Sequence, residues 1–168
     1  MTGTLSKGVL RSTTVMFLFV GLLGMWMGGC QTQELKVERL IKALQDQEWE
    51  VRASAALALG NIGGGAGDAV PALIKALQDQ DEWVRSRAAV ALGRIGSKDV
   101  VPVLIQALKD QHEEVRNNAA WALGRIGKDA VPALIQALKD QNIEVRQYAA
   151  GALGRIAAVD AVPALMQA

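Results

Sequence analysis

The chain has 168 residues, of which 51% are hydrophobic but only 4% aromatic, and its formal net charge is +1. So few aromatic residues argue against a large globular core and favour a fold packed from alanine and leucine. The first 29 residues carry Lys7 and Arg11 and no acid, so the remainder has a net charge of +1 − 2 = −1. A near-neutral chain lacks the concentrated basic face of a nucleic-acid-binding protein.

The N-terminus has the layout of a secretory signal. Lys7 and Arg11 form a basic segment, an apolar run follows over residues 15–27, and two glycines precede Cys30. The apolar run is short for a membrane span. Cys30 is the single cysteine, which excludes an internal disulfide framework.

Small residues directly before a lone cysteine resemble the lipobox of bacterial lipoproteins, although Met27 stands where that motif usually has leucine. The resemblance implies that residues 1–29 are removed, that Cys30 is acylated, and that residues 30–33 form a short membrane tether. Gln31, where aspartate would signal inner-membrane retention, favours the outer membrane if the host has two. An uncleaved anchor, or an ordinary signal with an incidental cysteine, is the alternative. Either alternative still directs the repeats out of the cytosol.

From residue 34 onward, one unit of about 30 residues repeats. A turn aspartate, a Val-Arg pair and a glycine recur together, and the aspartates are Asp46, Asp79, Asp110 and Asp140. Their intervals of 79 − 46 = 33, 110 − 79 = 31 and 140 − 110 = 30 residues are typical of a solenoid built from stacked copies. The units are 34–63, 68–96, 99–127 and 129–157, with a partial fifth unit at 160–168.

Each unit predicts two helices, and the second unit shows the pattern. Its first helix, 69–77, follows Asp68 at the expected N-cap, has Pro71 in its first turn, and carries an apolar stripe at helical spacing. Asp99, Asp129 and Asp160 repeat the expected N-cap. The sequence continues through a polar turn into a second helix at about 83–95. At its start, Trp83, like Trp49 in the first unit, is expected to cover the turn.

Glycines mark two positions in the second helices. We expect Gly60, Gly93, Gly124 and Gly154, inside the helices, to be points of close contact between units. Gly63, Gly96 and Gly127 are expected to end their helices as residues of positive φ, whereas the last unit has Ala157.

One hairpin cannot bury both apolar stripes, but stacked hairpins can. The sequence therefore predicts an all-α fold, a right-handed α-solenoid of stacked antiparallel helix hairpins. The partial last unit ends without a polar cap. We therefore expect either that the chain is a fragment or that another surface covers this end.

The segments VPALIKAL and VRxxAAxALGRIG, with the turn aspartate and the period, resemble the HEAT-like repeats first recognised in phycobilisome lyases. The resemblance implies that each turn aspartate and the arginine six positions later belong to a charged ladder bridging adjacent units. The ladder residues are Asp46, Arg52, Asp79, Arg85, Asp110, Arg116, Asp140 and Arg146. It does not fix a function, since such proteins include scaffolds, lyase subunits and a di-iron hydroxylase.

In the HEAT-like arrangement the second helices line the concave face. Three aligned positions of these helices, spaced i, i+3, i+7, form one stripe apart from the buried residues. Arginine, tryptophan and tyrosine in this stripe are typical of protein-binding surfaces. The candidates are Arg87, Trp121 and Tyr148, followed by Asn118, Arg94, Arg125 and Arg155. The alternative is that these are solvent positions free to vary.

Catalytic motifs are absent from the sequence. The hydroxylase of this family is expected to bind iron through His-Glu pairs after the Val-Arg, where this chain has Ala53-Ser54, Ser86-Arg87, Asn117-Asn118 and Gln147-Tyr148. His112-Glu113 falls in a turn, and Cys30 has no base nearby in sequence. We predict no catalytic residue, cofactor or metal, and a non-enzymatic scaffold binding an unidentified protein at the envelope. The alternative is an enzyme or lyase accessory of the HEAT-like family.

Overall fold

The computed structural model describes the backbone of residues 32–165 and the side chains of residues 32–157. Regular structure in this part is entirely helical, and residues from Val37 onward form one compact unit. The predicted signal at 1–29 and the predicted lipid site at Cys30 lie outside the described residues. Between residues 32 and 165 there is no helix with the length and apolar character needed to span a membrane.

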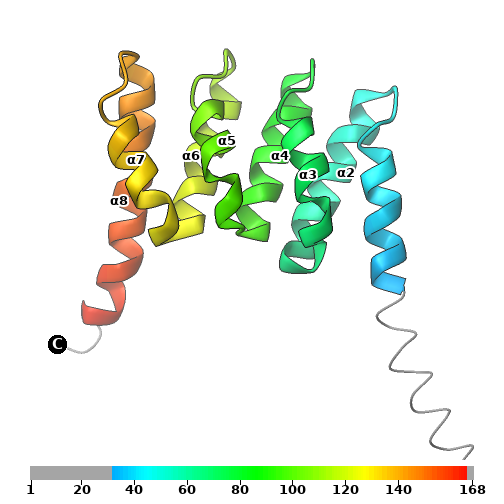
Figure 1. Cartoon of the computed structure of the whole chain (residues 1–168), viewed down its shortest axis with the longest axis horizontal. Helices are drawn as coiled ribbons and strands as arrows, with labels where there is room; N and C mark the ends of the chain where they lie inside the picture. Colours follow the sequence, from blue (N-terminus) through cyan, green and yellow to red (C-terminus); the bar gives the residue numbers. More distant parts are fainter. Residues whose placement is uncertain (1–31, 166–168) are drawn as a thin grey trace, which may run out of the picture. The chain divides into compact units, whose positions relative to one another are not determined.

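The helices pair into hairpins that stand side by side in chain order (Figure 1). A helix covers residues 32–43, and its part from Val37 onward pairs with α2 (Trp49–Ile62). The later pairs are α3 (Val70–Ala76) with α4 (Glu82–Ile95), α5 (Val101–Ala107) with α6 (Glu113–Ile126), and α7 (Val131–Ala137) with α8 (Ile143–Leu165). Short 3₁₀ segments, η1 (Gly63–Ala69), η2 (Lys98–Val100) and η3 (Gly127–Ala130), connect the hairpins. The predicted all-α solenoid of stacked hairpins is confirmed.

The core is a continuous seam of alanine and leucine between the two helix layers. Leucines of the first helices and of the second helices are fully buried in it: Leu73, Leu104, Leu134, Leu59, Leu92 and Leu123. Burying a leucine side chain stabilises the fold by roughly 1.5–3 kcal/mol, so a seam of this kind holds hairpins together that would not fold singly.

Successive second helices pack most closely, and glycine makes this possible. A methyl group on Gly60 would lie 2.8 Å from the Cα of Ala91, and one on Gly93 would lie 2.6 Å from the Cα of Ala122. Both distances are below van der Waals contact, so the predicted close contacts are confirmed there. Gly124 is looser, with 3.3 Å to Arg155, and Gly154 faces open space among the described atoms.

The helix ends follow the glycine pattern. Gly63, Gly96 and Gly127 have φ angles of 67°, 77° and 79°, which confirms their predicted role. At the equivalent position in the last unit, Ala157 does not terminate the helix, and α8 continues to Leu165. The described backbone of α8 therefore runs through Asp160, and the partial fifth unit at 160–168 stays a prediction. An L-residue disfavours positive φ, so the stop that glycine supplies is missing.

The predicted N-caps at Asp68, Asp99 and Asp129 are wrong. Helices α3, α5 and α7 begin after Ala69, Val100 and Ala130, and no side chain caps them. The chain enters each helix through a 3₁₀ turn in which the residue before the helix already has helical dihedral angles. A capping side chain needs an extended residue at that point, so Asp68 and its equivalents cannot serve.

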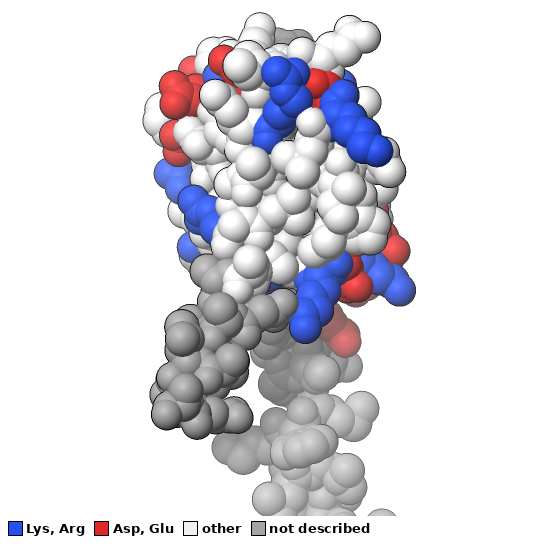
Figure 2. Space-filling model, turned by 90° about the vertical axis from the view of Figure 1, so that its left-hand side faces the viewer, with Lys and Arg blue, Asp and Glu red and all other residues white. Residues whose placement is uncertain are grey.

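The α7–α8 end of the stack presents a mostly uncharged surface with charged side chains around it (Figure 2). Exposed large hydrophobic residues gather on this hairpin, namely Ile135, Leu138 and Ile143. At the corresponding positions of α3 and α5, Ile74 and Ile105 are only partly exposed, because a further hairpin packs on them.

Candidate functional site

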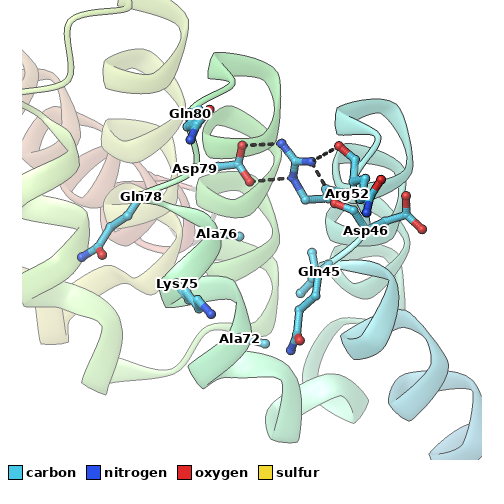
Figure 3. Close-up of a pocket in the computed structure, with 11 residues that line it drawn as sticks. Gln45, Asp46, Arg52, Ala72, Lys75, Ala76, Gln78, Asp79 and Gln80 are labelled. Carbon is cyan, nitrogen blue, oxygen red and sulfur yellow. Dashed lines mark hydrogen bonds and ion pairs between the residues drawn. The ribbon is translucent and has the colours of Figure 1, made fainter.

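Arginines at the starts of the second helices join neighbouring turns. The Nε and Nη2 atoms of Arg52 donate to the carboxylate of Asp79 at 2.7 and 2.8 Å, while its Nη1 donates to two backbone carbonyls of its own turn (Figure 3). Arg85 repeats the arrangement with Asp110, at 2.7 and 3.0 Å. The carboxylate partner of each arginine therefore belongs to the next unit, and the backbone partners belong to its own.

The turn aspartates have a second task. Asp79 and Asp110 each accept a hydrogen bond from the backbone N–H two residues later, at 3.0 and 2.9 Å, which closes the turn. Burial acts to raise the pKa of Asp79, but hydrogen bonds from Arg52 and the Asp81 amide outweigh it, so the pKa lies below its ordinary value. The pKa of Asp110 is lowered in the same way by Arg85 and the His112 amide, against burial. Both carboxylates are ionised structural groups at neutral pH.

Each pairing of a ladder arginine with the next unit is one rung of the ladder, and the third rung, at Arg116, differs from the first two. Lys109 takes the carboxylate of Asp140 at 2.7 Å, and Arg116 instead approaches Glu144 at 3.4 Å and lies over the Tyr148 ring at 5.7 Å from its centre. The Nε of Arg116 is buried without a hydrogen-bond partner. Units one and two have glutamine at the position of Lys109, so no competing cation exists there.

The ladder is open at both ends among the described side chains. Arg146 bonds to the backbone carbonyls of Asp140 and Gln141 at 2.8 and 2.9 Å and reaches no carboxylate. Asp46 accepts from the amide of Glu48 at 3.0 Å and has no arginine on its carboxylate. These groups hold turns and units together, and their arrangement offers no catalytic chemistry.

The second helices present a separate surface, here called the second-helix face. Each helix contributes residues spaced i, i+4, i+7, i+11. The resulting rows are Glu50, Trp83, Glu114 and Glu144; Ser54, Arg87, Asn118 and Tyr148; Leu57, Val90, Trp121 and Gly151; and Asn61, Arg94, Arg125 and Arg155. The structure thus brings all seven predicted binding residues onto one face.

The two predicted aromatic residues are shared between this face and the core. Trp121 and Tyr148 are both partly buried and pack against the hydrophobic seam. Arg125 lies 5.4 Å from the centre of the Trp121 ring, and Arg116 covers Tyr148. Only part of each ring is therefore available to a partner.

Polar residues of the face also contact neighbouring units. The Nδ2 of Asn118 donates to the Oγ of Ser86 at 2.8 Å, and Arg94 donates to the Oδ1 of Asn61. Arg87 is exposed and makes no hydrogen bond or ion pair with any described side chain. Like the exposed Arg155, it is free to meet a ligand.

Sequence reasoning missed Trp83. We expected it to cover the turn, but its side chain is 47% exposed, and Trp49 is 39% exposed. Trp83 lies one helical turn before Arg87 and therefore belongs to the second-helix face. The i, i+4 spacing of Trp83 and Arg87 is the sequence signal that places Trp83 on this face.

A groove of about 660 Å³ lies between the first turn and α3 (Figure 3). Gln45, Lys75 and Gln78 line it together with the Arg52–Asp79 pair, whose charges already satisfy each other. The side chains of residues 32–157 include no cluster of three or more histidine, cysteine, aspartate or glutamate residues that could hold a metal. His112 precedes α6 as its N-cap residue, in a turn as expected.

Stacked two-helix units with a polar ladder define an α-solenoid repeat protein. The sequence matches the HEAT repeat family over residues 37–112, 70–134 and 101–168. The chain belongs to this family.

Solved structures of several kinds are similar to it. The complex of CpcE and CpcF of phycocyanin lyase from Nostoc sp. PCC7120 is 33% identical with a TM-score of 0.60, over 76% of this chain and 55% of that one. Human deoxyhypusine hydroxylase is 32% identical with a TM-score of 0.58, over 71% and 43%. A designed armadillo repeat protein in complex with the peptide (KR)4 is 26% identical with a TM-score of 0.52, over 70% and 62%. The chain thus spans less than two thirds of each, and no curated protein sequence matches it.

Proposed function

We propose that this HEAT-repeat chain is a non-enzymatic scaffold that binds a partner protein on its second-helix face. The observation that carries the proposal is the contrast between two sets of arginines. The ladder arginines Arg52, Arg85 and Arg116 pair with carboxylates of the next unit, and Arg146 bonds to carbonyls of its own turn. In contrast, Arg87, Arg94, Arg125 and Arg155 bind neither a carboxylate nor a backbone carbonyl among the described residues. Arginine beside tryptophan and tyrosine is typical of interface hot spots. The peptide complex of the designed armadillo relative supports a peptide- or protein-binding role for this architecture.

Replacing Arg87, Trp121 and Tyr148 together by alanine tests this proposal. We expect the variant to lose a partner that the wild type captures from native membranes, with the partner identified by mass spectrometry and helicity checked by circular dichroism. The matched control replaces Lys42, Lys75 and Lys139, exposed residues outside the second-helix face, by alanine. Because Tyr148 also packs on Arg116, the single variants Arg87→Ala and Trp83→Ala repeat the test without touching the core. Equal capture by all variants refutes the proposal.

We further propose that a lipid on Cys30 tethers the repeats to the envelope, at the outer membrane if there are two. The basic segment, apolar run and small residues before the cysteine support this. Labelling with radioactive palmitate should mark the wild type and not Cys30→Ala, and the variant should leave the membrane fraction. An unlabelled wild type, or unchanged fractionation of the variant, contradicts the tether.

An enzyme or lyase accessory is the alternative, favoured by the likeness to phycocyanin lyase and deoxyhypusine hydroxylase. Against it, the positions after each Val-Arg carry no His-Glu pair. Metal analysis and absorbance of the purified protein separate the two. Stoichiometric iron or a bound bilin would favour the alternative.

A further inference from the structure

We propose that the second-helix face binds an extended, acidic segment of the partner, with a carboxylate at every third residue. This inference rests on the proposed function and names the chemistry of the partner. The row Arg94, Arg125 and Arg155 carries it, with Arg87 as a further contact.

The arginines repeat once per hairpin at the same position of successive second helices. Packed helices lie roughly 8–10 Å apart. Gly93 allows the close approach of α4 and α6, and a methyl group on Gly124 of α6 would lie 3.3 Å from the Arg155 side chain of α8. A polyproline II segment advances roughly 9 Å for every three residues and returns to the same side after three. One carboxylate in three residues would therefore meet one arginine per hairpin.

The positive charge of the row is not compensated within the face. Glu50, Glu114 and Glu144 form the opposite edge, 11 positions earlier in their helices, which is about 16 Å along a helix axis. That distance exceeds the screening length of about 8 Å at physiological salt. Asp99 and Asp129, in the connections after the helices, form no ion pair with the row. The acidic edge also confines an acidic ligand to the arginine side.

An apolar row runs beside the arginines. Leu57, Val90 and Trp121 lie about one helical turn before the arginine positions and are each partly exposed. Extended segments rich in proline bind in grooves lined by aromatic and apolar side chains, and guanidinium forks bind carboxylates with two hydrogen bonds. The face thus suits a segment whose acidic residues alternate with apolar or proline residues.

The test uses the full chain purified in detergent and a fluorescein-labelled peptide of repeated Glu-Pro-Pro. Fluorescence anisotropy should show saturable binding. A peptide of the same composition with its glutamates clustered at one end should bind at least about fivefold more weakly, and repeated Lys-Pro-Pro should not bind. Raising the salt concentration should weaken binding, since exposed charges are screened.

Two matched variants locate the site. Replacing Arg94, Arg125 and Arg155 by glutamine should weaken Glu-Pro-Pro binding at least about tenfold, since three charge-assisted contacts are lost. Replacing Lys42, Lys75 and Lys139, exposed cations outside the second-helix face, by glutamine changes the net charge equally and should alter binding less than about twofold. Circular dichroism checks that both variants are folded.

The inference is overturned if Glu-Pro-Pro fails to bind, binds independently of salt, or binds equally to both triple variants. Equal affinity for the clustered peptide overturns the three-residue register. The proposed function has its own outcome. If the Arg94, Arg125 and Arg155 variant still captures the partner that the Arg87, Trp121 and Tyr148 variant loses, the face binds a protein but its ligand is not an acidic segment.

Discussion

At the scale of single residues, Lys109 redirects the ladder. It occupies the carboxylate of Asp140, to which Arg116 would bond if the third rung repeated the first two. The lysine is 47% exposed, and such an exposed ion pair contributes little to stability because water and salt screen it. Meanwhile the buried Nε of Arg116 makes no hydrogen bond and is only ion-paired with Glu144 at 3.4 Å, which is unfavourable. The loss of stability at this rung therefore comes from Arg116, not from the Lys109–Asp140 ion pair that stands in place of an Arg116–Asp140 pair.

Lys109→Gln is accordingly expected to restore the rung between Arg116 and Asp140. The free energy of unfolding, measured in urea, should stay within about 0.5 kcal/mol of wild type or rise, although an ion pair is removed. A double-mutant cycle between Arg116 and Asp140 should show coupling in the Lys109→Gln background and little in wild type. A loss above about 1 kcal/mol would contradict this account.

The stability that the ladder contributes depends on pH through Asp79. Burial alone would raise the pKa of Asp79. The hydrogen bonds from Arg52 and the Asp81 amide lower this pKa by more than burial raises it, so the folded pKa lies below the unfolded value. The pair therefore contributes stability above the unfolded pKa of about 4, and this stability is lost as pH falls through the lower folded value. Asp79→Asn should be less stable by about 1–3 kcal/mol at pH 7 and should show a smaller decline in unfolding free energy between neutral and acid pH. Parallel curves for the two proteins would exclude Asp79 as a source of the acid sensitivity.

At the scale of helices, glycine sets how closely they approach. Gly93→Ala should destabilise the protein by about 1–3 kcal/mol, because its methyl group would lie 2.6 Å from the Ala122 Cα, a backbone atom that cannot yield freely. Gly154→Ala is the matched control. It faces open space in a helix interior and should gain up to about 1 kcal/mol from helix propensity. Thermal unfolding of both variants measures the difference, and a destabilised Gly154→Ala would show a neighbour packed at that site.

The helices themselves could be predicted because each apolar stripe repeats at helical spacing in every unit. What failed was local. Asp68 resembles an N-cap in sequence, but the preceding 3₁₀ turn, which depends on packing, removes the extended residue a cap requires. The ladder residues could be predicted from the resemblance to HEAT-like repeats, whereas the choice of Asp79 or Asp140 as partner depends on which side chains of adjacent units compete. Trp83 was missed because its position directly after the polar turn suggested contact with that turn rather than a place on the second-helix face.

At the scale of the whole repeat unit, the α7–α8 end differs from the interior of the stack. Interior hairpins bury both sides, whereas Ile135, Leu138 and Ile143 are 46%, 38% and 59% exposed. Such residues contribute little to folding where they are, but a grouped apolar surface favours association between molecules. The end surface therefore affects solubility more than stability.

Replacing Ile135 and Ile143 together by glutamine separates these two effects. The melting temperature should change little, since exposed substitutions usually alter stability by less than about 0.5 kcal/mol each. The concentration at which sedimentation velocity first detects oligomers should rise. Leu134→Ala, at a fully buried neighbour, is the contrasting variant and should cost about 2–5 kcal/mol. If the glutamine variant unfolds as readily as Leu134→Ala, these isoleucines are buried in solution, and a further surface covers this end of the stack.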